Sequence, residues 1–277
     1  MIRLLQIEFQ KIWLNSASKV LIFVYFALLT VIAMLTMVEL DFGFVQINLS
    51  EQEIFSFPLI WHFATYFAAI LKFFLLLVIV SMVANEYSNR TLKQNLIDGL
   101  SKKEFVLSKF LMVTVFALLS TIFLGLIILV VGYINSDFTA GNIPFREMEF
   151  LLAYFVKLWG FFSFGLFLAM LVKRSAFAVG FMLLWQILEG IFYSIMRWQL
   201  FGEATADKIQ QFFPLSAMSN LIKQPVQRLK AVKTLGEMSK TDVSYDYAVH
   251  FTDIAIVLAW TFIFVFLTYQ LLKKRDL

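Results

Sequence analysis

The sequence contains no cysteine, and this absence excludes several kinds of functional site. Without cysteine there is no disulfide framework, no thiol nucleophile and no cysteine-bound metal. Histidine is nearly as scarce, since His62 and His250 are the only two, and no carboxylate–histidine cluster has metal-ligand spacing. We therefore expect neither a metal nor a cofactor to be bound by this chain.

The chain also lacks the motifs of an enzyme. No G-x-x-x-x-G-K-[ST] phosphate-binding loop occurs, and the nearest approach, at residues 99–103, lacks the first glycine, the spacing and a preceding strand. The apolar runs contain no paired acids, no nucleophile elbow and no HExxH. We therefore expect no catalytic activity in the chain itself.

Charged residues are few, at 15% of the 277 residues, whereas 61% are hydrophobic and 33 are Phe. A soluble domain has about 45–50% apolar and about 25% charged residues. The sequence therefore predicts an all-α integral membrane protein with a single transmembrane domain, residues 1–277. Six apolar runs approach the ~20 residues that cross a bilayer as a helix: residues 20–38, 57–84, 110–133, 150–172, 175–196 and 251–272.

Residues 1–18 precede the first run and have an amphipathic pattern. Apolar residues that include Phe9 and Trp13 recur with helical spacing, while Arg3 and Lys11 fall mostly on the other side. A helix with one Trp and few basic residues is typical of the membrane interface. We expect an interfacial helix here.

The distribution of positive charge predicts the orientation. With six crossings, both termini, the 85–109 segment and Lys173–Arg174 share one side and hold 13 of the 23 Lys and Arg residues. The two short loops on the opposite side hold one, so the basic side is expected to be cytosolic. The outer loop, residues 197–250, has seven basic and five acidic residues, but charge counts lose force in long loops.

The outer loop is expected to contain short helices at 207–211 and 226–240, interrupted by Pro225. Between them, the apolar patch that begins at Phe212 is too short to cross the membrane. It is expected either to enter the outer interface or mouth between helices, or to pack as a surface helix on top of the domain.

Residues 85–109 form a polar, basic segment between the second and third apolar runs. Thr91 to Ile97 can form two helical turns, and Asp98–Gly99 is a turn signal. Ser101 and Glu104 have the spacing of a capping box at the start of the next helix. A short helix, a turn and a capped helix start are more order than a solvated loop needs, so we expect a surface that transmits force.

This layout resembles the permease subunit of ABC-type exporters of the type-two membrane family. The resemblance rests on the interfacial first helix, the six runs, the Glu-x-x-x-x-Thr-Leu helix that starts at Glu86, the tight hairpin before Ser175 and a Pro-containing outer segment. The family usually has Gly where this chain has Arg90, and Pro where it has Leu100.

The resemblance implies that the short helix is a coupling helix seated in a groove of a separate ATPase subunit. The residues expected to contact that subunit are Glu86, Arg90, Thr91, Leu92, Asn95, Leu96 and Ile97. Two ATPase copies would bind ATP and Mg and rock two permease subunits, the second being an identical or related chain. The implied location is the cytoplasmic membrane of a prokaryote, with lipid and an outer or periplasmic partner as further contacts and no nucleic acid.

Lys157 and Glu189 are ionisable residues inside the fourth and fifth runs. Because these two helices are antiparallel neighbours, the residues are expected at one depth, as a charged pair or as separate groups facing an outer vestibule. They also support a secondary transporter driven by an ion gradient, although no inverted repeat is found. A further alternative is a non-transporting membrane subunit that passes ATPase motion to an outer partner.

Overall fold

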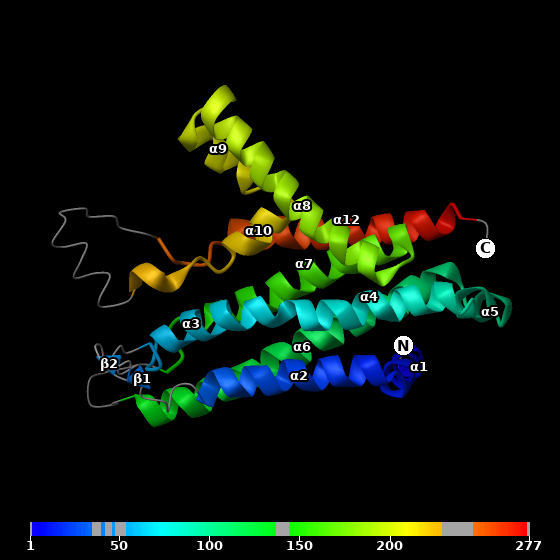
Figure 1. The fold of residues 1–277 in the computed structure, drawn as a ribbon, viewed down its shortest axis with the longest axis horizontal. Helices are drawn as coiled ribbons and strands as arrows, with labels where there is room; N and C mark the ends of the chain where they lie inside the picture. The colour runs from blue at the N-terminus through cyan, green and yellow to red at the C-terminus, as the bar shows by residue number, and fades with distance from the viewer. Residues whose placement is uncertain are drawn as a thin grey trace.

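The computed structural model describes residues 2–34, 40–41, 46–47, 54–136, 144–228 and 246–275. These residues form an all-α membrane protein, apart from one two-residue antiparallel pair, β1 (Leu40–Asp41) and β2 (Gln46–Ile47). Most of the long helices run roughly along one axis (Figure 1). One end of the bundle carries α1 and α5, and is called the α5 end below; the other carries β1 and β2.

Six helical segments account for the predicted apolar runs. They are α2 (Ser16–Met34), α3 (Leu59–Ala68) continued by η3 (Ala69–Leu71) and α4 (Lys72–Ser88), α6 (Lys102–Asn135), α7 (Glu149–Val172), α8 (Ser175–Ile195) with the π-helix η5 (Met196–Leu200), and α12 (Phe251–Lys273). In the described residues, five of these segments are long and apolar enough to cross a membrane. A sixth span is formed if α2 is counted together with α1, to which it is bent by 93°.

The N-terminal boundary differs from the prediction, because α1 (Ile2–Leu14) ends before residue 18 and α2 begins at Ser16. Asn15 lies between them and accepts hydrogen bonds through Oδ1 from the backbone N–H groups of Ala17 (3.0 Å) and Ser18 (3.3 Å). An asparagine in this position caps a helix start. The cap allows the chain to turn sharply without leaving the first amides of α2 unsatisfied.

Helix α7 is the centre of the bundle and packs against α4, α6, α8 and α12. Gly165 and Gly160 allow close approach on two sides of it. A Cβ on Gly165 would lie 2.2 Å from Leu76 of α4, and one on Gly160 would lie 2.9 Å from Val257 of α12. Small residues at such contacts let membrane helices pack through the van der Waals attraction of their backbones.

A buried polar triangle joins three of the membrane helices. The hydroxyl groups of Tyr25 in α2, Ser120 in α6 and Tyr154 in α7 are all within hydrogen-bond contact, with Tyr25 to Tyr154 at 2.8 Å and Ser120 to Tyr154 at 3.0 Å. Because hydrocarbon offers no water, buried hydroxyls in a membrane must find partners in the protein. The triangle satisfies all three.

Helices α7 and α8 are joined by the two-residue tip that the sequence predicts. Lys173 takes the left-handed conformation with φ 63°, which ends α7. The last carbonyls of α7 accept hydrogen bonds from Arg275, whose guanidinium lies 2.6 Å from Met170 O and 3.0 Å from Leu171 O. A cation at this position also complements the negative end of the α7 dipole.

The segment between α8 and α12 contains α9 (Glu203–Gln210), α10 (Pro214–Asn220) and the 3-10 helix η6 (Pro225–Arg228). Of the two short helices expected here, the first begins four residues earlier than predicted, and most of the second lies outside the described residues. Most of the apolar patch forms α10 and the turn after it. Leu215 and Met218 of α10 and Leu221 and Ile222 of the turn are buried, and α10 packs against α7, α8 and α12, whereas Phe212 is 55% exposed. The patch from Leu215 onward therefore lies inside the bundle and not on its surface.

Candidate functional site

The polar segment between α4 and α6 folds into α5 (Thr91–Ile97), the helix that the sequence predicts. Arg90 precedes it with φ 57° and Gly99 follows it with φ 98°. The left-handed conformation costs a non-glycine residue about 1–2 kcal/mol, so Arg90 carries strain that glycine would not. The capping box is confirmed: Ser101 Oγ accepts from the Glu104 N–H at 3.2 Å, and Glu104 Oε2 accepts from the Ser101 N–H at 2.9 Å.

The seven residues expected to contact a partner separate into two groups. The exposed or partly exposed ones are Arg90, Thr91, Asn95, Leu96 and Ile97. Leu92 is only 2% exposed because it packs into the core and holds α5 against the rest of the bundle. Glu86 is 3% exposed and lies in α4, outside α5. Both are therefore corrected from contact residues to internal ones, and the exposed Lys93 and Gln94 belong to the α5 surface instead.

Glu86 belongs to a buried ionic quartet with Glu8, Lys11 and Lys109. Lys109 Nζ donates to Glu8 Oε2 at 2.5 Å and to Glu86 Oε1, while Lys11 Nζ donates to Glu86 Oε1 at 2.8 Å and to Glu8 Oε1 at 3.4 Å. Glu8, Glu86 and Lys109 are almost completely buried, and Lys11 is partly exposed. The quartet joins α1, α4 and α6 at the α5 end of the bundle.

The quartet carries no net charge, and each of its acids lies against two cations. Burial lowers the pKa of Lys11, but its hydrogen bonds to the two carboxylates and their charges outweigh burial, so this pKa lies above its ordinary value. Removing one partner from a buried ion pair costs about 3–5 kcal/mol because the other charge is left uncompensated. The second carboxylate oxygen, Glu86 Oε2, is buried and has no hydrogen-bond partner among the described residues.

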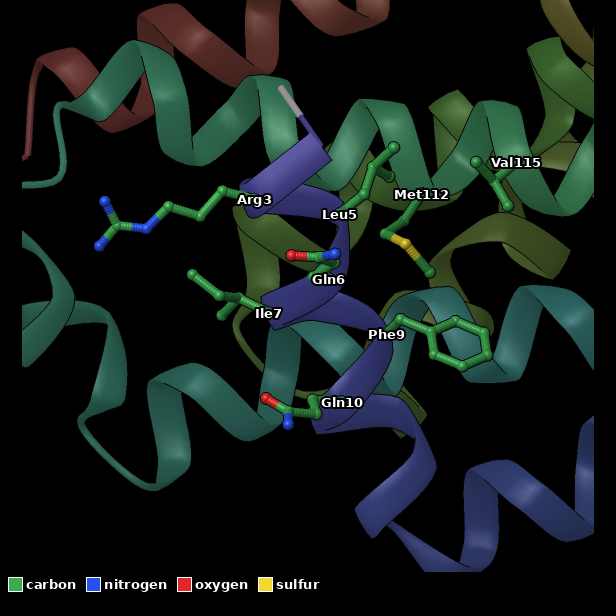
Figure 2. A pocket seen from close by; sticks show the side chains of 8 residues that line it. All are labelled: Arg3, Leu5, Gln6, Ile7, Phe9, Gln10, Met112 and Val115. Atoms are coloured by element: carbon green, nitrogen blue, oxygen red, sulfur yellow. The ribbon is translucent and has the colours of Figure 1, made fainter.

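Besides a groove of about 400 Å³ that has Lys11 and Glu86 of the quartet in its lining, two further grooves border α1. One, of about 490 Å³, separates α1 from the α5–α6 turn and has Glu8, Lys11, Asn95, Asp98 and Ser108 among its lining residues. The other is an open groove of about 580 Å³ along α1 and α6 (Figure 2). In Figure 2, Phe9 lies toward Met112 of α6, while Arg3 points to the other side of the helix. Helix α1 is thus amphipathic, as expected of an interfacial helix.

Lys157 and Glu189 do not form the expected pair. In the described part of the chain no ion pair joins them, and each lies against α10 instead. Glu189 accepts hydrogen bonds from Leu215 N at 3.0 Å, Ser216 N at 2.8 Å and Trp185 Nε1 at 2.9 Å, and Lys157 donates to Ser219 O at 3.4 Å. The prediction placed both charges on facing helices correctly but did not include the short helix that lies between them.

The sequence reasoning missed Glu8 and Lys109 as a pair. Glu8 is the one acid in α1, and it occurs on a helix whose other charged residues, Arg3 and Lys11, are basic. Lys109 lies eight residues inside α6, past the polar segment and at the start of an apolar run. An acid in an interfacial helix and a lysine at a membrane boundary were the available signals, but nothing local connects two residues 101 positions apart.

The comparison with known proteins agrees with this architecture. The family described as ABC-2 family transporter protein matches residues 41–270, which is most of the chain. The match covers α5, the quartet residues of α4 and α6, and the α7–α10 region. No curated protein sequence matches the chain.

Proposed function

Because this chain belongs to the ABC-2 family of transporter proteins, we propose that it is the membrane-spanning permease of an ABC exporter. In this proposal a separate subunit hydrolyses ATP, and α5 receives the resulting movement. The membrane is the cytoplasmic membrane of a prokaryote, and the α5 end, where the basic residues gather, faces the cytosol. The chain supplies the pathway and no catalytic residues.

The observation that carries the proposal is the construction of α5. It is a two-turn helix outside the apolar part of the bundle, fixed at both ends by tight turns and from beneath by Leu92. Because its backbone is fixed in this way, force applied to its outer face passes to α4 and α6 and is not absorbed by a flexible loop. This is the property that a coupling helix requires.

The outer face of α5 also indicates the chemistry of its partner. Ile97 is 75% exposed, and the cationic side chains of Arg90 and Lys93 are exposed beside it. We infer that the ATPase subunit offers an apolar pocket for Ile97 with carboxylates at its rim. An exposed apolar anchor surrounded by polar contacts is the usual arrangement of an energetically important interface residue.

The test is Ile97→Asp in a tagged full-length chain purified in mild detergent. This change places a carboxylate in the inferred apolar pocket, so the ATP-hydrolysing subunit is expected to be lost from the complex while the permease remains in the membrane. Phe201→Asp is the matched control. Like Ile97, Phe201 is a large hydrophobic residue that is exposed (55%), but it lies beyond α8, away from α5. Retention of the ATPase by Ile97→Asp would show that α5 is not the contact.

We further propose that two copies of this chain form the transporter, each with one ATPase subunit, and that α8 lies at their interface. Figure 1 shows α8 leaving the bundle at an angle. Gln186 lies in the middle of α8, exposed, and its amide has no hydrogen-bond partner among the described residues. A polar side chain facing hydrocarbon is costly. Across a two-fold axis, one Gln186 amide can both donate to and accept from its equivalent.

A glycine on the same face of α8 agrees with this interface. Gly190 lies one turn after Gln186, and a Cβ added there would meet nothing within 4 Å, in contrast to Gly160 and Gly165 of α7. Open space beside a glycine on a membrane helix leaves room for a second backbone to approach.

The gradient-driven alternative rested on Lys157 and Glu189 as intramembrane charges. Since both are engaged with α10, the observation that favoured it is accounted for by structure. A subunit that only passes ATPase motion to an outer partner shares the α5 contact with an exporter. Stimulation of ATP hydrolysis by a transported compound is expected for the exporter alone.

A further inference from the structure

The ionic quartet of Glu8, Lys11, Glu86 and Lys109 lies where α4 leads into α5 and where α6 leaves it. Glu86 lies in the last turn of α4, just before the chain enters α5, and Lys109 lies two turns into α6, just after the chain leaves it. Their direct ion pair therefore ties together the two helices between which α5 is held. Glu8 and Lys11 extend the same network to α1.

Helix α1 packs on α6, α2 and α4 with Ile12 in the core, and the quartet adds direct ionic contacts to α4 and α6, the two helices that hold α5. The groove of about 490 Å³ lies between α1 and the α5–α6 turn, and Glu8, Lys11 and Ser108 form part of its wall. Ser108 Oγ lies 3.5 Å from Glu8 Oε1, which adds a contact from α6 to the same carboxylate. A movement of α5 that displaces the ends of α4 and α6 therefore pulls directly on Glu8 and Lys11.

Stability alone does not explain charges at this position. Well-packed apolar side chains of similar volume hold buried helices together at least as strongly as buried ions do. What ion pairs add is direction, because each ammonium must stay within hydrogen-bond distance of particular oxygens. The quartet therefore fixes the register of α1 against α4 and α6 through particular pairs of atoms, in addition to the apolar packing of Ile12 in the core.

We propose that Glu8, Lys11, Glu86 and Lys109 are positioning residues that carry the movement of α5 to α1. Helix α1 is then a moving part of the coupling unit and not a passive anchor on the membrane surface. This inference rests on the proposed function, because it requires an ATPase that moves α5. It adds that the movement reaches the membrane interface through four named side chains.

The experiment uses the complex of the full chain with its co-purified ATPase subunit and a reporter on α1. The chain has no cysteine, so Leu14→Cys, at a side chain that is 81% exposed, can carry one environment-sensitive fluorophore. The measured quantity is the change in its emission between the nucleotide-free complex and the complex trapped with ATP and vanadate. The ATPase content of each preparation is measured separately.

Three charge arrangements are compared in this background. The first reverses α1 (Glu8→Lys with Lys11→Glu), and the second reverses the bundle (Glu86→Lys with Lys109→Glu). Each places like charges across the contacts of α1 while keeping its own two charges opposite. The third combines all four substitutions and restores every pair with reversed sign, so composition and net charge never change.

We expect the nucleotide-dependent change in emission in the unswapped complex and in the fourfold variant. In either twofold variant it should fall by about fivefold or more, the lower range of typical coupling factors, with the ATPase still bound. Undiminished change in the twofold variants, or no change in the unswapped complex with the ATPase bound, overturns the inference. Loss of the ATPase from the unswapped complex would instead contradict the proposed function.

A milder variant keeps the inference testable if the twofold variants fail to insert. Lys11→Met removes the partly exposed member and with it Lys11–Glu86, one of the two ion pairs that join α1 to the bundle, while the buried pair Glu8–Lys109 stays in place, so a smaller emission change is expected. A reduced emission change in this variant, with normal thermal stability, supports the positioning role, because a structural contact alone would alter stability first. An unchanged response in Lys11→Met then contradicts it.

Discussion

Glu189 and Lys157 lie at opposite ends of one short helix, α10, and complement its dipole. The Glu189 carboxylate accepts from the N–H groups of Leu215 and Ser216 in the first turn, and the Lys157 ammonium donates to Ser219 O in the last. Anions are stabilising at helix N-termini and cations at C-termini. Two charges from neighbouring membrane helices thus hold a buried helix between them, which explains how both remain in the apolar interior.

The two charges are expected to contribute unequally and independently to stability. Glu189→Gln turns an acceptor-only group into one that faces amide donors with an NH₂, so it should cost about 1–3 kcal/mol. Lys157→Met loses one 3.4 Å hydrogen bond and should cost less. The measurement is thermal unfolding in detergent of both single variants and the double variant. Because the residues contact opposite ends of α10 and not each other, the losses should add to within about 0.5 kcal/mol, whereas a large deviation would indicate coupling, either directly or through α10.

The contact between α4 and α7 makes Gly165 intolerant of a methyl group. In Gly165→Ala the new Cβ would lie 2.2 Å from Leu76 Cδ1, so Leu76 must shift within a packed core. We expect a loss of about 1–3 kcal/mol, as is typical of overpacking. Gly180→Ala is the matched control in α8, where nothing lies within 4 Å. It should be neutral or stabilising in thermal unfolding, and equal losses in both variants would contradict this account of α7.

The proposed orientation predicts which ends of the bundle are reachable from outside the cell. Single cysteines are placed at Ser88, which is exposed at the end of α4, and at Lys208, which is exposed in α9. A membrane-impermeant thiol reagent added to intact cells should label Lys208→Cys and leave Ser88→Cys unlabelled until the cells are opened. The reverse pattern would invert the orientation and place α5 outside the cytosol.

The proposed dimer predicts crosslinking through α8. If the two Gln186 side chains meet across a two-fold axis, Gln186→Cys should give a disulfide-linked dimer when native membranes are oxidised. Leu126→Cys provides the comparison, since Leu126 is 58% exposed but lies in α6 and not in α8. Similar crosslinking at both positions would indicate random collision in the membrane.

The parts of this structure that the sequence predicts well depend on residues close together in the chain. The α5 helix, the capping box of Ser101 and Glu104, and the turn at Gly99 were all recognisable because each needs fewer than ten residues. The break at Asn15 was also local, since an asparagine before Ser16 is an N-cap signal, but the continuous apolar pattern on both sides concealed it.

The parts that were not predicted depend on contacts between distant residues. Glu86 was interpreted as a surface residue because it borders a polar segment, yet its ion pairs with Lys11 and Lys109 hold it inside. Lys157 and Glu189 were placed on facing helices, but an apolar patch from the following loop inserts between them as α10. A hydropathy pattern shows which segments are apolar and does not show which one fills the space between two others.

The cap on α7 has a consequence for how the protein is made. The carbonyl groups of Met170 and Leu171 receive their donors from Arg275, which is 105 residues later than Met170 in the chain. While the ribosome is still translating the intervening residues, α7 is in the membrane without the hydrogen bonds that Arg275 donates to these carbonyls. It also lacks its packing against α12. The central helix of the bundle is therefore finished last, and we expect nascent chains stalled before α12 to be substrates for membrane quality-control proteases.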